Sequence, residues 1–130
     1  MAGPKLKPSF QVKALTIVCT DRWRSDRFYR EVLGAVDLSE DIGCRWYKLG
    51  SFTITLMPNA NKRSPATFGE HTLTMLYLEV DDLEAAASHF ARHQVEVIMP
   101  SDGQMMIIAD PDGLPIEVWQ REIESEERPA

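Results

Sequence analysis

Residues 14–21 read ALTIVCTD, and residues 75–82, MLYLEVDD, follow the same pattern later in the chain. In each segment an apolar, β-branched run typical of a buried strand ends at an aspartate, Asp21 or Asp82, that suits the first position (N-cap) of a helix. Helically spaced apolar side chains follow both aspartates, and Tyr29 of the first set aligns with Phe90 of the second. The agreement is in physical type rather than in identity, and it indicates a duplicated structural unit.

The remaining segments fit two copies of one unit, each with the order strand, helix, strand, strand, strand. A unit of about 60 residues buries too little surface to be stable alone, so the two units must pack together. We predict an α+β fold in one domain over residues 10–120, with module 1 at about 10–60, module 2 at about 71–120, and polar tails at 1–9 and 121–130. Helices are expected over residues 25–33 and from residue 83, and strands over residues 12–20, 45–49, 52–57, 73–80, 95–99, 104–109 and 115–120.

The composition excludes several classes of protein. The chain has 130 residues, of which 44% are hydrophobic and 26% are charged, and its formal net charge is −6. This acidic balance argues against a protein that coats nucleic acid, because phosphate binding needs a basic surface. No apolar run approaches the roughly 20 residues of a membrane span, and the N-terminus lacks the apolar core of a secretory signal. With only 2 cysteines, the chain is expected to be cytoplasmic.

Three motifs resemble those of the vicinal oxygen chelate superfamily, which contains glyoxalase I, bleomycin-resistance proteins and extradiol dioxygenases. They are FYREVLG at residues 28–34, LEVDD at residues 78–82 and DPDGLPIE at residues 110–117. Their order and spacing extend the resemblance over roughly residues 11–120. The resemblance implies two paired βαβββ modules that form a curled mixed sheet around a central cavity, in a protein that is usually a homodimer. Whether the modules pair within one chain or across two chains is open at this point.

Superfamily members that use a metal bind it inside this cavity, and the resemblance implies four ligand positions in this chain. These positions fall at Ala14, Thr55, Met75 and Glu117. Only Glu117 keeps a metal-binding side chain, whereas a catalytic divalent ion generally needs about three protein ligands. His71 lies four residues before Met75, which is about 13 Å along a strand and outside a coordination sphere. We therefore expect no cofactor, and a divalent metal held by a non-standard ligand set is the alternative.

Strand alternation predicts which side chains line the cavity. If Glu117 faces the cavity, the same faces carry Ala14, Thr16, Val18, Thr53, Thr55, Met57, Met75, Tyr77, Glu79 and Trp119. The opposite faces are wholly apolar and should pack under the helices; they carry Leu15, Ile17, Cys19, Leu76, Leu78 and Val80. We assign a catalytic role to Glu117 and ligand binding to Thr16, Thr55, Met75, Tyr77, Glu79 and Trp119. A mostly apolar and aromatic cavity with two carboxylates suits an apolar or cationic organic molecule.

Each of these assignments has a simpler alternative. Glu117 could be an inert remnant of the family pattern that is paired with a neighbour. Glu79 fits a position at the rim, because carboxylates are rarely buried. Tyr77 and Trp119 could fill the interior of the sheet without touching a ligand.

Two further groups of side chains are expected to be solvated. His89 and His93 have the spacing of a zinc-binding pair, but histidines near a helix C-terminus are more often solvated cations that the helix dipole favours. The arginines of the first helix are expected to form a solvated face, with a possible role in admitting an anionic ligand; they are Arg22, Arg24, Arg27 and Arg30.

The leading hypothesis is a metal-independent protein of the bleomycin-resistance type that binds a small organic molecule. It acts as a homodimer and has no nucleic-acid or membrane partner. The alternative is a metal-dependent isomerase or lyase similar to lactoylglutathione lyase, or a dioxygenase, whose replacement ligands come from His71, Glu79 or a partner chain. In such an enzyme Glu117 would be a ligand or a base. A third hypothesis is a regulatory or scaffold dimer with a filled cavity, so enzymatic activity is left open.

Overall fold

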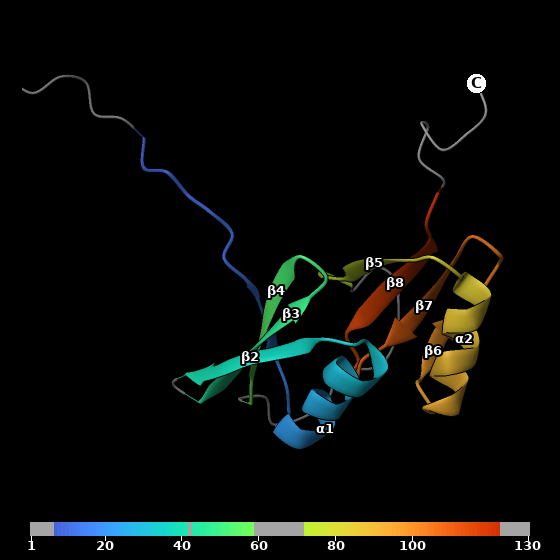
Figure 1. The fold of residues 1–130 in the computed structure, drawn as a ribbon, viewed down its shortest axis with the longest axis horizontal. Coiled ribbons are helices and arrows are strands. Elements are labelled where there is room, and N and C mark those ends of the chain that lie inside the picture. Colours follow the sequence, from blue (N-terminus) through green and yellow to red (C-terminus); the bar gives the residue numbers. More distant parts are fainter. Residues whose placement is uncertain (1–6, 42, 59–71, 123–130) are drawn as a thin grey trace, which may run out of the picture.

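The computed structural model describes residues 7–41, 43–58 and 72–122, so His71 and most of the two expected tails lie outside the described residues. Module 1 contains β1 (Leu15–Val18), α1 (Arg22–Arg27), the π-helical turn η1 (Phe28–Val32), β2 (Val36–Asp41), β3 (Cys44–Leu49) and β4 (Phe52–Met57). Module 2 contains β5 (Leu76–Val80), α2 (Leu83–Arg92), β6 (Val97–Met99), β7 (Met105–Ala109) and β8 (Pro115–Gln120). Figure 1 shows α1 near the junction of the two modules and α2 on the far side of module 2.

Each module forms one four-stranded sheet, and the two sheets have the same topology. Sheet A has the order β1-β4-β3-β2, and sheet B has the order β5-β8-β7-β6. In both sheets the first strand runs parallel to the fourth, and the other pairs are antiparallel. The predicted α+β class and the duplicated, curled mixed-sheet architecture are therefore confirmed. Within the described residues, no helix is long and apolar enough to cross a membrane.

The main differences from the predicted elements fall in module 1. The first strand covers only residues 15–18 of the expected 12–20, and the helix starts at Arg22 rather than at residue 25. The strand β2 was not delimited by the sequence, because its residues VDLSED are largely polar and exposed. Its pairing with β3 is also irregular, with a register shift between Asp37 and Ser39. An exposed edge strand of this kind lacks the apolar alternation that marks a strand in a sequence.

Both aspartates predicted as N-caps have that role. The Asp21 carboxylate accepts hydrogen bonds from the backbone N–H groups of Trp23 at 3.0 Å and Arg24 at 3.2 Å. The Asp82 carboxylate accepts one from the backbone N–H of Ala85 at 3.1 Å. These bonds satisfy donors that have no partner in the first turn of a helix, which explains why each helix begins where it does.

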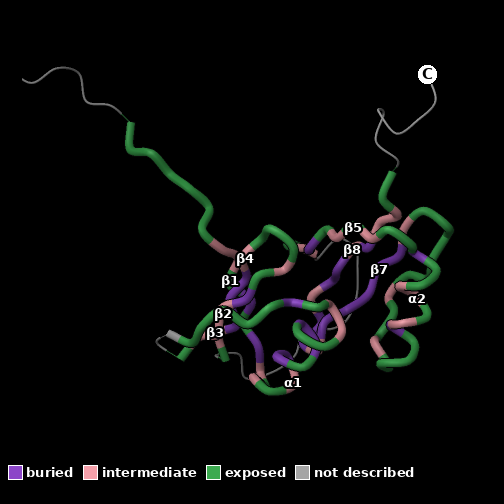
Figure 2. Tube along the Cα trace, in the orientation of Figure 1, coloured by how far each residue is buried: buried purple, intermediate pink, exposed green. Residues whose placement is uncertain are grey.

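Each sheet has a helix-side face, which packs against the core, and an open face on its other side. The helix-side faces of both sheets belong to one continuous core, whose sheet residues are Ile17, Tyr47, Ile54, Leu56, Leu76, Met106, Ile108, Ile116 and Val118. Figure 2 shows buried stretches of chain along β4, β7 and β8, among other strands. The predicted alternation is thus confirmed for β1, where Ile17 is buried and Thr16 and Val18 are exposed. Because both helix-side faces turn toward the same core, the two open faces look outward.

A polar contact that we name the latched junction joins α1 to the turn at residues 110–114 of module 2. The Asp112 carboxylate accepts hydrogen bonds from the Thr20 hydroxyl at 2.6 Å and the Thr20 backbone N–H at 3.2 Å. It also accepts one from the Ser25 hydroxyl at 3.3 Å and pairs with Arg24 at 3.3 Å. Asp112 is only 8% exposed, so these partners replace its lost hydration. The predicted turn sequence therefore also connects the modules.

Asp110 completes the latched junction from the same turn. One of its oxygens accepts a hydrogen bond from the Tyr29 hydroxyl at 2.8 Å, and the other accepts the backbone N–H groups of Asp112 and Leu114 at 2.9 and 2.8 Å. Burial raises the pKa of Asp110 above its ordinary value, although these hydrogen bonds oppose the rise. Burial also raises the pKa of Tyr29 well above its ordinary value, so Tyr29 stays protonated and donates.

Candidate functional site

The open face of sheet B carries four of the side chains that the sequence assigned to the cavity. In the parallel pairing of β5 with β8, Tyr77 lies opposite Glu117, and Glu79 lies opposite Trp119. The Tyr77 and Trp119 rings are stacked, with centroids 5.7 Å apart and planes 11° from parallel. The Trp119 Nε1–H group donates to the Glu117 carboxylate at 3.1 Å. Tyr77 is 58% exposed, so this aromatic pair presents a flat apolar surface to the outside.

The open face of sheet A carries the two predicted threonines. Thr16 on β1 lies opposite Thr55 on β4, and Trp46 on β3 lies on the other side of Thr55. The Lys13 Nζ atom is 5.4 Å from the centre of the Trp46 ring, a distance typical of a cation–π contact. The Thr55 hydroxyl is buried and donates to the backbone carbonyl of Arg45 at 2.9 Å. Thr55 is therefore engaged within the sheet.

Trp46 was not among the residues that the sequence assigned to the cavity, but its placement could have been found. The hairpin of β3 and β4 turns through Gly50 and Ser51, so Leu49 must lie opposite Phe52. Three residues further along each strand, Trp46 must lie opposite Thr55. Residues directly opposite in an antiparallel pair share a face. If Thr55 faces the cavity, Trp46 must therefore face it as well.

Of the four positions implied for a metal, only Glu117 carries a side chain of the usual metal-binding kind. Ala14 and Met75 lie just before β1 and β5, and neither side chain can supply a hard or imidazole ligand. The Thr55 hydroxyl donates to a carbonyl, and the Glu117 carboxylate accepts from Trp119. No cluster of three or more His, Cys, Asp or Glu side chains suited to a metal ion occurs among residues 7–41, 43–58 and 72–122. The described residues do not fit the divalent metal that the family implies.

One chain divides the predicted site residues between two outward-facing surfaces. Thr16 and Thr55 lie on the open face of sheet A, whereas Tyr77, Glu117 and Trp119 lie on that of sheet B. Glu79 lies on the same face of β5 as Tyr77, and Met75 precedes the strand at the same parity. Since the two sheets share a core through their helix-side faces, one chain does not enclose a cavity between its open faces.

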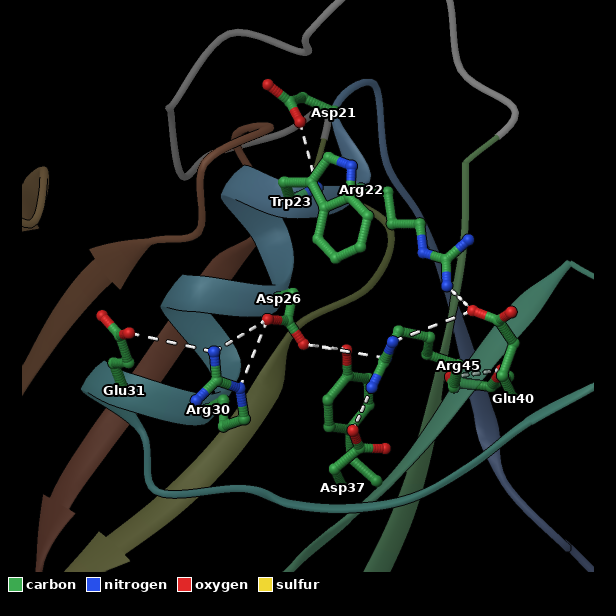
Figure 3. Close-up of polar contacts among 11 residues, drawn as sticks. Asp21, Arg22, Trp23, Asp26, Arg30, Glu31, Asp37, Glu40 and Arg45 are labelled. Carbon is green, nitrogen blue, oxygen red and sulfur yellow. Dashed lines mark hydrogen bonds and ion pairs between the residues drawn. The ribbon is translucent and has the colours of Figure 1, made fainter.

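A polar cluster beneath sheet A connects β3, the strand that carries Trp46, to α1 and β2. Figure 3 shows Asp26 of α1 at its centre. Asp26 accepts hydrogen bonds from the Tyr47 hydroxyl at 2.5 Å and from Arg30 at 3.1 Å. Burial alone would raise the pKa of Asp26, but the hydrogen bonds from Tyr47 and Arg30 outweigh it and hold that pKa below its ordinary value. Arg45 pairs with Asp37 and so connects β3 to β2.

The expectation of a solvated arginine face on the first helix is wrong for two of the four arginines. Arg22 pairs with Glu40 of β2, and Arg24 pairs with Asp112, so both connect α1 to other elements. Arg30 is exposed and pairs with Asp26 one helical turn earlier. The sequence could not show the pairing of Arg24, because Asp112 is 88 positions from Arg24.

His89 of α2 also differs from the expectation of a solvated side chain, whereas His93, which follows the helix, is exposed. The His89 Nε2 atom lies 2.8 Å from the backbone carbonyl of Val32, which accepts its hydrogen. His89 and His93 are in edge-to-face contact, with ring centres 4.6 Å apart. His89 therefore connects the helix of module 2 to the end of the helical segment of module 1.

Comparisons with known proteins agree with this fold. The family model of the Glyoxalase/Bleomycin resistance protein/Dioxygenase superfamily matches residues 11–118. The chain is 28% identical to the uncharacterized protein YaeR of Escherichia coli (strain K12), with 85% of this chain and 96% of the relative covered. It resembles the trypanothione-dependent glyoxalase I of Leishmania major with a TM-score of 0.69 at 21% identity, covering 86% and 87% of the two chains. It also resembles TnmS3, an antibiotic binding protein from Streptomyces sp. CB03234, with a TM-score of 0.61 at 21% identity, covering 90% and 100%.

Proposed function

Because the chain belongs to the Glyoxalase/Bleomycin resistance protein/Dioxygenase superfamily, we propose that it binds a small organic molecule without a divalent metal. The binding site lies between the open face of sheet A of one copy and the open face of sheet B of a second copy. The observation that carries this proposal is the outward placement of two aromatic faces in one chain, Trp46 on one and the Tyr77–Trp119 stack on the other. Such faces become a pocket only when another surface covers them.

The exposed apolar side chains favour a second copy of this chain as the surface that covers the open faces. Val18 on the open face of sheet A is 43% exposed, and Tyr77 and Met99 on sheet B are 58% and 41% exposed. Large apolar side chains exposed on both open faces favour burial of these faces against a partner. A two-fold axis would bring sheet A of each copy over sheet B of the other and would create two equivalent sites. The homodimer predicted from the sequence is thus part of this proposal.

The side chains of the two faces favour a planar ligand that is apolar or cationic. Trp46 can stack on one surface of a ring system, and Trp119 and Tyr77 can stack on the other. Glu117 and Glu79 lie beside the aromatic stack and can attract a positive charge. Glu117 is oriented by the Trp119 N–H, which leaves the remaining lone pairs of its carboxylate for a ligand. In this proposal Glu117 binds the ligand, and a proton-transfer role is the corresponding prediction if the ligand is also a substrate.

The ligand positions on these strands support binding without a metal. Ala14 and Met75 carry no metal-binding atoms of the usual kind, and Thr55 is hydrogen-bonded within its own sheet. Binding of the TnmS3 type therefore accounts for the residues better than metal-dependent isomerisation. Elemental analysis of the purified protein tests this point. A stoichiometric divalent metal whose removal lowers the melting temperature would favour the enzyme alternative.

A mixing experiment tests the two-copy site with proflavine, a planar cationic dye, as the probe. Trp46→Ala and Trp119→Ala should each weaken proflavine binding about tenfold, which corresponds to about 1.4 kcal/mol of lost stacking. Trp23→Ala, which removes a 60% exposed tryptophan on α1, is the matched control and should change nothing. Refolding the two site variants together makes half of the dimers mixed, and one site in each mixed dimer is intact, so about a quarter of the sites should recover. No recovery would mean that both tryptophans act within one chain, and a monomeric protein would contradict the proposal.

A further inference from the structure

The second contact between the modules borders an open pocket. It lies where module 1 faces α2, and its volume is about 790 Å³. We name it the hollow junction. Its walls are mostly apolar and come from the helix-side faces of both sheets and from the two helical segments; they include Leu15, Ile54, Leu78, Val118, Ala86 and Phe90. Volumes of roughly 300–1,000 Å³ are typical of small-molecule pockets.

The hollow junction is the pseudo-symmetric counterpart of the latched junction. In the latched junction, the turn between β7 and β8 contacts α1 through Asp110 and Asp112. In the hollow junction, the equivalent turn between β3 and β4 consists of Gly50 and Ser51 and borders the cavity beside α2. This shorter turn has no carboxylate that could reach the helix. The β3–β4 turn therefore places no carboxylate against α2, unlike the β7–β8 turn at the latched junction.

We propose that the hollow junction is a second binding site, which takes an uncharged, predominantly apolar small molecule. Burial of such a molecule against aliphatic and aromatic walls is favoured by the hydrophobic effect. Polar groups are confined to a few lining positions, where Ser51 and Thr74 can bond a hydroxyl or carbonyl of the ligand.

The charged groups at the hollow junction argue against a carboxylate ligand. The guanidinium of Arg121 borders the cavity but already pairs with Asp81 at 2.8 Å. The His89 Nε2–H bond is engaged by the Val32 carbonyl at 2.8 Å. Glu79 also borders the cavity and would repel an anion. A neutral molecule needs no cationic partner and is not repelled by Glu79.

This site overlaps the proposed site on the open faces at one strand, β5. The two share Tyr77 and Glu79, because β5 is the edge strand of sheet B and both of its faces border the cavity. Trp119, Glu117 and Trp46 do not line the hollow junction, and Val118 lines it from the opposite face of β8. Variants on the two surfaces can therefore separate the two sites.

Fluorescence titration of the full chain with Nile red, a neutral apolar dye, tests the proposal. Ala86→Phe places a ring into the cavity from α2 and should weaken Nile red binding about tenfold or more, because the added atoms occupy the ligand volume. Ala85→Phe introduces the same side chain at an exposed position of the same helix and should leave the affinity unchanged. Decanol should displace the dye, and decanoate should displace it far less.

A second measurement keeps the test decisive if Ala86→Phe does not fold. Methyl groups of Leu15, Leu78 and Val118 in the wild-type protein should show nuclear Overhauser contacts to bound decanol. The proposal is overturned if these contacts are absent, or if Ala85→Phe weakens dye binding as much as Ala86→Phe does. It is also overturned if the apparent affinity follows protein concentration, because a second copy would then cover the cavity.

Discussion

The two junctions between the modules occupy equivalent places in a duplicated fold, yet they differ in content. At the latched junction, Tyr29 of the helical segment donates a hydrogen bond to Asp110. At the hollow junction, Phe90 takes the position that aligns with Tyr29 and is equally buried, but it has no hydroxyl. The comparison shows that packing is duplicated, whereas the contacts made by buried carboxylates belong to the latched junction; the hollow junction has a hydrogen bond between His89 and the Val32 carbonyl. We therefore expect substitutions of polar groups to affect the junctions very differently.

The largest effect is expected for Asp112→Ala. The change removes the acceptor of four contacts from Thr20, Ser25 and Arg24, and it leaves buried donors without a partner. We expect the free energy of unfolding to fall by about 3 kcal/mol, as measured by urea denaturation. Asp81→Ala is the control, because Asp81 takes the place in module 2 that Thr20 has in module 1 and forms only an exposed ion pair. Its expected cost is about 0.5 kcal/mol or less. Equal costs would remove the distinction between the junctions.

A smaller effect is expected for Tyr29→Phe, which makes the latched junction resemble the hollow one. The variant keeps the buried ring but removes the hydrogen bond to Asp110. We expect a loss of about 1.5 kcal/mol in the free energy of unfolding. Tyr77→Phe deletes the same atom at a 58% exposed position, and its effect should be within about 0.5 kcal/mol. A Tyr29→Phe variant as stable as the wild type would show that the hydroxyl does not strengthen this junction.

The N-caps provide a comparison in which the modules should behave alike. Asp21→Ala and Asp82→Ala each remove a carboxylate that accepts backbone N–H groups in the first turn. Each should lower the free energy of unfolding by about 1 kcal/mol. Thermal denaturation followed by circular dichroism can measure both. A much larger loss at Asp21 would mean that the cap also supports the latched junction through the neighbouring Thr20.

The smallest effect concerns the dependence of stability on pH. Burial raises the pKa of Asp110, so the protonated form is favoured in the folded state. The stability from this group is present below the ordinary pKa of an aspartate and is lost as the pH rises through the raised value. Asp110→Asn cannot ionise and should therefore gain stability relative to the wild type as the pH rises through that range. The pKa of Asp26 is lowered, so its contribution to the free energy of unfolding grows as the pH rises through the acidic range. Asp26→Asn lacks this contribution and should lose stability relative to the wild type over the same range. Urea titrations at several pH values measure both slopes, and parallel curves for the wild type and both variants would contradict the assignment.

The sequence predicts the fold well because the relevant signals are local. Strand alternation, an N-cap aspartate and a helical stripe recur within each module, and they place Ile17 and Leu76 on the helix-side faces as observed. The edge strand β2 is not predicted from the sequence, because its exposed residues carry no apolar alternation. The hairpin register, by contrast, contains enough information to place Trp46 beside Thr55.

The site is less predictable because it depends on contacts between distant segments. Nothing near Asp112 in the sequence indicates that it bonds Thr20, 92 positions away. Nor does alternation within one strand reveal whether two sheets turn their open faces toward each other or outward. That arrangement follows from the shared core, and it separates Thr55 from Glu117 within one chain. The roles assigned to Glu117, Tyr77, Glu79 and Trp119 stay predictions for the mixing experiment to test.

The pairing of each helix with the other module's turn has a consequence for how such a protein can change over time. A single module of this pattern could bury its helix-side face only against a copy of itself, and symmetry would then make both junctions identical. Any substitution would alter the two contacts together. Once both modules belong to one chain, each junction can vary independently. One junction can then be held by carboxylates while the other has none in its turn, and the two modules stay together. Covalent linkage of the modules therefore allows the hollow junction to change in sequence while the latched junction keeps the modules together.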